Sequence, residues 1–362
     1  MSPRHFCCTI CGWVVLADWD PNSSETWANQ FRGLCTGPDG LRLTGVGLYD
    51  DPNEGILRAP IDRDMRWSDV GHHESADIEF GAMTQPAIED RHGFIFHDAC
   101  WNLLEKASHP VPVSFERLFE VCKSLPFTPD HLALSWGHDF GGAAIANNVH
   151  YFPWEDRHDT REFYKPHPVF SKDPYEASGV DRVLVEDPEQ PPTLTRTTAS
   201  PQEPIRDCFA SLPQELCTAI AICLPTADVL RARLASKAFW PVFYSQQFWA
   251  SRFKTSTDRS WFFEARECSL RDWRWLYRRT TDARISPGLQ NRRRIWELLQ
   301  GVLDALALSW NELPFDLPAM WSPDSVLRET NHRAEAIGDL WSDEHPRNFD
   351  QPKSLATGVD ED

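Results

Sequence analysis

The sequence has no long hydrophobic run and no excess of positive charge. A membrane-spanning helix needs about 18 or more mainly apolar residues in a row, and no stretch approaches that length. The first residues also lack the apolar core of a secretory signal peptide. Acidic residues outnumber basic ones by 54 to 36, and the formal net charge of −18 disfavours nucleic acids and anionic membranes as partners. We therefore expect a cytoplasmic or nuclear protein, or one found in both compartments, that binds neither membranes nor nucleic acids.

Common catalytic motifs are also missing. The chain contains neither the Gly-x-x-x-x-Gly-Lys-Ser/Thr loop nor the Gly-x-Gly-x-x-Gly motif that bind phosphate groups. His138 and Asp139 are neighbours in a glycine-rich stretch, but adjacent side chains rarely point the same way, and no serine or cysteine nucleophile is placed beside them. Leucine-rich, WD and kelch repeats are absent. These absences predict a protein without catalytic activity. A metal-dependent or thiol enzyme in the N-terminal region remains an alternative.

The chain does contain enough apolar material for substantial hydrophobic cores, with 41% hydrophobic residues, 12% aromatic residues and 16 tryptophans. Its pattern predicts an α+β protein, with an irregular N-terminal α/β domain, a mid-chain unit of three helices, aromatic-rich C-terminal helices and a disordered tail. The expected boundaries are 1–170 for the N-terminal domain, 171–205 for a proline-rich linker, 206–253 for the three-helix unit, 254–313 for the C-terminal helices and 314–362 for the tail. Tyr175–Leu184 is the part of the linker best able to pack on the first domain.

Cysteine and histidine are spaced as in a metal site. Ten cysteines without a secretory signal indicate reduced thiols or metal ligands rather than a disulfide framework. Cys8 and Cys11 form a Cys-x-x-Cys-Gly motif, and His97 and Cys100 come where a strand over 94–96 is expected to enter a helix capped by Asp98. Four such ligands are typical of closed structural zinc sites. Cys7 and Cys35 are competing ligands, and the alternative is that all these residues are core residues or free thiols.

A locally basic segment runs from Arg266 to Arg294. Its interleaved tryptophans and tyrosines could in principle stack on nucleic-acid bases. A solvated face of an aromatic-cored bundle, or a patch paired with the acidic first domain, is the interpretation that we prefer. The segment includes the most regular predicted helix, 291–310, and we expect the C-terminal helices to fold back on the first domain.

The mid-chain unit starts with a stripe of apolar residues. Leu212, Leu216, Ile220 and Leu224 repeat every four residues, which predicts one face of a helix. Ser211, with Gln214 three positions later, is typical of a helix N-cap, and Pro225 ends the helix. Thr226 is placed to cap a second helix.

This stretch resembles the F-box. The matching residues are Leu212-Pro213, Glu215-Leu216, Ile220, Leu224-Pro225, Asp228, Leu230, Leu234, Ser236-Lys237 and Phe239-Trp240. The resemblance implies a docking site for the Skp-family linker protein of cullin-based (SCF-type) ubiquitin ligases. The residues expected to bind that linker protein are Leu212, Pro213, Leu216, Ile220, Leu224, Pro225, Leu230, Leu234 and Trp240. Their apolar stripe should be exposed when the protein is alone, while Phe239, Trp240, Phe248 and Trp249 link the box to the following helices.

Other segments look similar to F-box proteins of filamentous fungi. They are the Cys-x-x-Cys-Gly start and the stretches that begin at His97, Trp136, Ser245 and Arg271. The box lies mid-chain rather than at the N-terminus, so the sequence does not indicate which part of the chain receives the substrate. The resemblance implies a non-catalytic adaptor for ubiquitin-dependent degradation, which would bind an unknown protein substrate and, through the linker protein, a cullin. A zinc-stabilised interaction scaffold outside a ligase is the alternative.

Overall fold

A computed structural model describes the parts of the chain that follow here. They are residues 6–15, 26–37, 40–51, 56–73, 77–80, 93–124, 140, 169–185, 207–267, 272–281 and 285–307. All belong to one compact unit, Met1–Pro323. The predicted tail and the His138–Asp139 pair lie outside the described residues.

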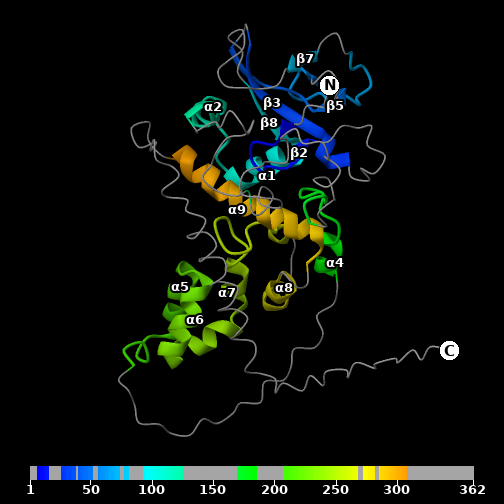
Figure 1. The fold of residues 1–362 in the computed structure, drawn as a ribbon. Coiled ribbons are helices and arrows are strands. Elements are labelled where there is room, and N and C mark those ends of the chain that lie inside the picture. The colour runs from blue at the N-terminus through cyan, green and yellow to red at the C-terminus, as the bar shows by residue number, and fades with distance from the viewer. Residues whose placement is uncertain are drawn as a thin grey trace, which may run out of the picture. The chain divides into compact units, whose positions relative to one another are not determined.

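An antiparallel sheet forms the N-terminal part of the protein, with helices later in the chain (Figure 1). The strands are β3 (Gln30–Gly37), β4 (Gly40–Leu43), β5 (Gly47–Asp51), β6 (Ile56–Pro60), β7 (Asp77–Phe80) and β8 (Gly93–His97). Their order is β4-β3-β5-β6-β7, and β8 pairs with β3 in a register that places Phe31 opposite His97. A short 3-10 helix, η1 (Thr26–Asn29), precedes β3, and β1 (Phe6–Cys7) pairs separately with β2 (Val14–Val15). The mixed architecture is thus confirmed, and the expected irregular domain is organised around a regular sheet.

Helices α1 (Asp98–Ser108) and α2 (Phe115–Ser124) pack against β3, and α2 also contacts β4. The two helices enclose one core, in which the rings of Phe94 and Phe119 lie 5.4 Å apart. The prediction that Asp98 caps α1 is wrong, because the N-cap position belongs to His97. Asp98 instead accepts hydrogen bonds from Arg32 Nε at 2.6 Å and Arg66 Nη2 at 2.9 Å, which link the start of the helix to the sheet.

The long helix α9 (Pro287–Ala307) packs on α1 and α2. The expected return of the C-terminal helices to the first domain is therefore confirmed, and Arg117 Nη2 donates to the Ala305 carbonyl at 3.3 Å. The helix begins four residues earlier than predicted. Proline is favoured at the first helical position, where its missing N–H leaves no hydrogen bond unmade.

Residues 169–185 belong to the folded body. They include helix α4 (Val180–Val185), and Phe170, Ala177 and Val183 are buried. Arg292 Nε donates to the Pro174 carbonyl at 2.7 Å. The linker predicted from residue 171 therefore starts too early, and its remaining part, 186–205, lies outside the described residues.

Two arginines of the basic segment bond to other groups of the protein, and one of them is buried. Arg292 is fully buried and pairs with Glu264 at 2.7 Å. Arg266 donates to the carbonyls of Phe253 and Ser260. The expectation of a solvated face is wrong for Arg292, whereas Arg266 is exposed. A guanidinium has several donors in a planar fork, so it can satisfy the carbonyl groups of irregular segments that have no regular backbone partner.

The mid-chain unit consists of α5 (Gln214–Cys223), α6 (Thr226–Ala235), the 3-10 helix η4 (Lys237–Tyr244) and α7 (Gln246–Ser251). The predicted caps Ser211 and Thr226 are wrong. Pro213 and Pro225 hold the two N-cap positions, and the Ser211 hydroxyl donates to the Cys208 carbonyl instead. Helix α7 contacts α8 (Trp273–Arg279), and η5 (Phe263–Arg266) lies between them in the chain.

Candidate docking face and candidate metal centre

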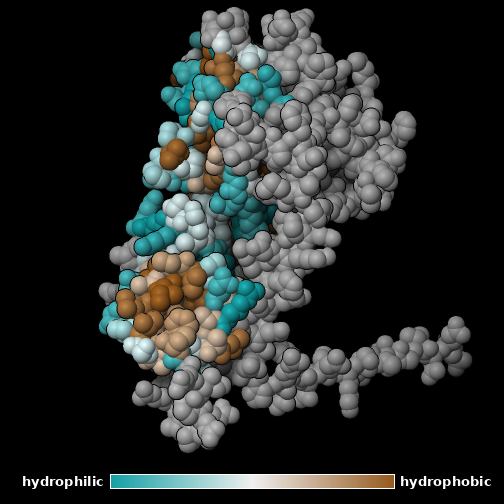
Figure 2. All heavy atoms as spheres, turned by 90° about the vertical axis from the view of Figure 1, so that its left-hand side faces the viewer, coloured by the Kyte–Doolittle hydropathy of each residue, from teal (hydrophilic) through white to brown (hydrophobic). Residues whose placement is uncertain are grey.

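The mid-chain unit has a buried face and an exposed apolar face. Cys217 and Ala221 of α5, Val229 of α6 and Phe239 of η4 are buried. On the other side, large apolar side chains are open to solvent, and Figure 2 shows a hydrophobic patch over α5 and α6. We call the outer side of these elements the docking face. Its exposed members are Leu216, Ile220, Leu234 and Trp240, which expose 51%, 36%, 74% and 48% of the possible area of each residue.

The predicted stripe is only partly on this face. Leu216 and Ile220 are exposed as expected, and so are Pro213 and Pro225. Leu212, Leu224 and Leu230 are half-buried and pack against the core. The reason is the length of α5: it covers only 214–223, so that Leu212 and Leu224 lie outside the helix and do not follow its periodicity.

Aromatic residues fix the unit to the body. Phe248 and Trp249 are buried, and the Trp249 ring lies 4.8 Å from that of Tyr277 in α8. The expected role in this link holds for Trp249 and for Phe248, whose ring packs on it, but is wrong for Trp240. Phe239 is buried against Phe209, which precedes α5. Trp240 is exposed, and its Nε1 donates to the Arg233 carbonyl at 3.0 Å. The sequence pattern also missed two exposed aromatic residues near the face, Phe209 and Tyr244.

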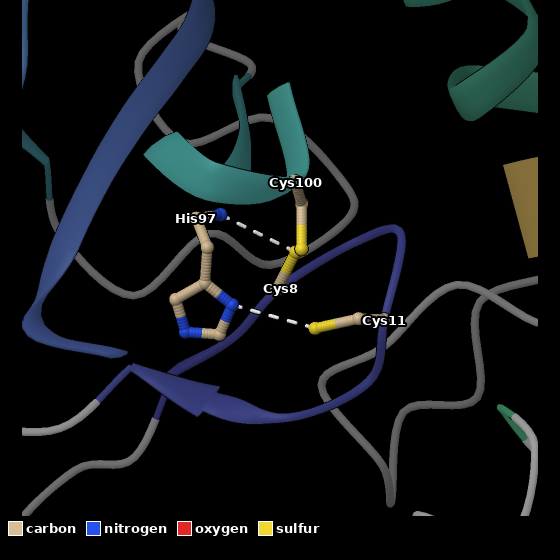
Figure 3. Close-up of side chains that lie close together, drawn as sticks. All are labelled: Cys8, Cys11, His97 and Cys100. Carbon is tan, nitrogen blue, oxygen red and sulfur yellow. Dashed lines mark hydrogen bonds between the residues drawn. The ribbon is translucent and has the colours of Figure 1, made fainter. Parts of the chain in front are cut away.

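Four predicted ligands meet in the N-terminal part. Cys8 and Cys11 lie in the turn between β1 and β2, His97 ends β8, and Cys100 is in the first turn of α1 (Figure 3). All four are buried, and their ligand atoms lie within 4.8 Å of one another. The cluster could therefore hold a metal ion, and it brings together residues up to 92 positions apart in the chain.

Backbone geometry directs the thiols inward. Gly12 has a φ of 67°, a left-handed conformation that glycine adopts without steric cost, and the ring of Phe140 occupies the space where a Cβ would lie. Trp13 N–H donates to Cys11 Sγ at 3.4 Å, and His97 N–H donates to Cys8 Sγ at 3.3 Å. Backbone N–H groups that donate to sulfur stabilise thiolates. A glycine after the second cysteine allows the tight turn that such contacts need.

The pKa values of Cys11, His97 and Cys100 depend on the other members of the cluster. Burial opposes ionisation of Cys11, but hydrogen bonds with Cys100 and Cys8 and the charge of His97 lower its pKa well below the usual thiol value. Burial alone would lower the pKa of His97, whereas negative charge on Cys11 and Cys8 raises it to about 10. Burial and the neighbouring thiols raise the pKa of Cys100. A cation that replaces these protons would compensate the buried thiolates, so the donor set fits a metal ion.

The competing ligands do not join the cluster in the described part of the chain. Cys35 packs in a second core with Phe31, Leu57 and Ile95, where burial raises its pKa to about 11. The side chain of Cys7 lies outside the described residues. Among described side chains, the group of Cys8, Cys11, His97 and Cys100 is the one with metal-ligand geometry.

No protein-family profile, curated protein or solved structure matches this chain. Within the described residues, no helix combines the length and apolar character that crossing a membrane requires.

Proposed function

We propose that this protein is a substrate adaptor of a cullin-based, SCF-type ubiquitin ligase, and that its docking face binds the Skp-family linker protein. The supporting observation is the exposure of Leu216, Ile220, Leu234 and Trp240, which are residues of the F-box pattern, on a unit whose opposite face is packed. Large apolar side chains gathered on one face mark interaction sites more often than ordinary surface. The chain itself would perform no catalytic step.

The size of the face is compatible with specific binding. Full burial of one leucine or isoleucine side chain contributes about 1.5–3 kcal/mol. Leu216 and Leu234 are 51% and 74% exposed, so burial of their remaining surface would supply on the order of 2–4 kcal/mol before the costs of association are counted. The aromatic contact between Trp249 and Tyr277 holds the unit on the body, so a target bound elsewhere on that body would be kept near the ubiquitin-charged enzyme. The gain in rate is one of proximity.

Charged substitutions on the docking face test the proposal. We expect Leu216→Asp combined with Leu234→Asp to weaken binding to the Skp-family linker protein at least about 100-fold, because both buried contacts are replaced by desolvated charge. The measurement is binding of the purified full chain by calorimetry. Val70→Asp with Val111→Asp, two exposed apolar positions away from the face, is the matched control. Unchanged affinity in the Leu216/Leu234 variant would contradict the proposal.

Binding to the linker protein alone is also compatible with a scaffold outside a ligase. Reconstitution with a cullin and the ubiquitin-transferring enzymes separates the two functions. An adaptor recruits the linker–cullin assembly and supports ubiquitin transfer to a bound protein or to itself, and a scaffold does not.

We further propose that Cys8, Cys11, His97 and Cys100 hold a structural zinc ion. Three sulfur ligands and one imidazole are a typical zinc donor set, and four protein ligands fill a tetrahedral site without an open position for a substrate. The ion would supply cross-linking between the β1–β2 turn and the start of α1. Zinc binding of this kind contributes on the order of 10 kcal/mol to folding.

Metal analysis tests the zinc assignment. We expect one zinc ion per purified wild-type chain and its loss in Cys11→Ser, because three ligands remain and a charge is removed. Cys208→Ser, at an exposed cysteine, should keep the ion. Wild-type protein without stoichiometric zinc, purified without chelators, would rule out the assignment.

A further inference from the structure

Arg294 reaches from α9 to the four-ligand cluster. Its Nη1 donates to the carbonyl of Cys11 at 3.1 Å and to the carbonyl of Phe140 at 2.6 Å. Its guanidinium carbon lies 4.4 Å from the centre of the Phe170 ring. The Nη2 atom is buried and has no hydrogen-bond partner. A cation is therefore placed beside the cluster with one donor group still unused.

The neighbouring arginines show how unusual this placement is. Arg292 pairs with Glu264, and Arg293 pairs with Glu297 at 2.9 Å. Within the described part of the chain, Arg294 makes no ion pair with a carboxylate. Its Nε donates to the side-chain amide oxygen of Asn291, which is neutral. Burial lowers the pKa of Arg294, and negative charge on Cys11 and Cys100 opposes that shift. The hydrogen bond to the Cys11 carbonyl places this guanidinium beside a residue whose thiol belongs to the cluster.

Charge balance gives this placement a purpose. Three thiolates, a neutral imidazole and a divalent ion carry a net charge of −1, and an uncompensated charge is costly in a buried site. Residues that contact metal ligands from outside commonly adjust the affinity of the site. We propose that Arg294 is the outer counter-charge of the metal centre, and that it thereby couples zinc binding to the packing of α9 on α1 and α2. The inference rests on the zinc assignment proposed above.

The coupling would extend to the rest of the body. Helix α9 also holds η5 through the Arg292–Glu264 pair, and Trp296 Nε1 donates to Ser260 Oγ at 2.9 Å. Coupling between two binding events is reciprocal. If α9 packing strengthens zinc binding, zinc binding strengthens α9 packing by the same free energy. The metal would then help to hold the segment after the box against α1 and α2.

Zinc affinity of full-length variants tests the inference. We expect Arg294→Met to weaken zinc binding about 10- to 100-fold in competition with a chromogenic chelator, and Arg294→Lys to keep most of the affinity because the charge remains. Arg293→Met, which removes an exposed pair on the same helix, should bind zinc like the wild type. As a second readout, zinc removal should speed amide hydrogen exchange in α9 of the wild type, and more weakly in Arg294→Met.

Three results would overturn the inference. They are wild-type zinc affinity in Arg294→Met, an equal loss of affinity in Arg294→Lys and Arg294→Met, and hydrogen exchange in α9 that does not respond to zinc in the wild type. If Arg294→Met does not fold, a folded Arg294→Lys with a loss of ten-fold or more decides against a role of charge. Wild-type protein that binds no zinc would remove both the zinc assignment and this inference. A failure confined to the Arg294 variants would leave the zinc assignment standing.

Discussion

At the scale of single residues, the metal cluster depends on one glycine. Gly12 combines a left-handed backbone with a position where Phe140 leaves no room for a Cβ. Its N–H donates to the Cys8 carbonyl at 2.9 Å, which closes the turn that carries both cysteines. A side chain at this position would have to displace either the turn or the ring.

We expect Gly12→Ala to lower the free energy of unfolding by about 2–5 kcal/mol. Left-handed backbone costs a residue with a Cβ about 1–2 kcal/mol, and displacement of a packed aromatic ring adds about 1–3 kcal/mol. Chemical denaturation measures the sum. Gly71→Ala is the control, because Gly71 also has a positive φ, of 102°, but open space around its Cβ position. Equal losses in both variants would show that contact with Phe140 has no effect.

The ligands of the cluster could be predicted from the sequence, but the contacts of Arg294 could not. Cys8, Cys11, His97 and Cys100 were predictable, because metal ligands belong to few residue types and come in short pairs with a characteristic spacing. Spacing alone could not exclude Cys35 as a ligand. The structure excludes it, because Cys35 lies in β3 with its side chain in the second core. The two carbonyl groups that accept from Arg294 Nη1 lie more than 150 positions away, and no local pattern marks such a contact.

At the scale of elements, the end of α5 depends on a buried arginine. Arg252 donates to the carbonyls of Ala221, Ile222 and Leu224 at 2.7–3.2 Å. The last carbonyl groups of a helix have no partner within the helix, so one guanidinium does for α5 what a C-cap glycine does elsewhere. The same side chain lies over the Phe248 ring, and it thereby links α5 to α7.

Arg252→Met should reduce the stability of the docking unit by about 2–4 kcal/mol, because several buried acceptors lose their donor at once. Urea denaturation, followed by tryptophan fluorescence, measures the loss. Arg231→Met removes an exposed pair with Asp228 and should change stability by less than about 0.5 kcal/mol. If Arg252→Met also lowered stability by less than about 0.5 kcal/mol, water would be replacing the guanidinium as the donor to these carbonyl groups.

Element boundaries were predicted less well than the elements themselves. Apolar periodicity indicated the helices of the mid-chain unit and α9, and these helices are present. Serine and threonine indicated the wrong starting residues for α5 and α6, because a proline comes directly before each helix and takes the N-cap position. The linker was predicted to begin at 171, with Tyr175–Leu184 able to pack on the first domain. Residues 169–185 are folded, so the packing expected of Tyr175–Leu184 is present and the start of the linker was placed too early.

At the scale of the whole molecule, the described parts form one body rather than a chain of separate domains. Helix α9 contacts α1 and α2, and its Asn291 and Arg292 hold residues 170–175. The mid-chain unit joins the same body through α7 and α8. The predicted boundaries at 170 and 254 therefore separate segments that share a core.

This arrangement has a consequence for synthesis on the ribosome. The surface formed by α1, α2 and residues 169–185 emerges first, but α9, which covers it, ends roughly 120 residues after α4. At about 5–20 residues per second, the gap lasts on the order of 6–24 s. The mid-chain unit, whose contacts are local, can fold within that time, whereas the apolar surface of α1 and α2 stays uncovered until α9 is made. Molecular chaperones would thus meet the N-terminal half of the nascent chain before its own C-terminal helix does.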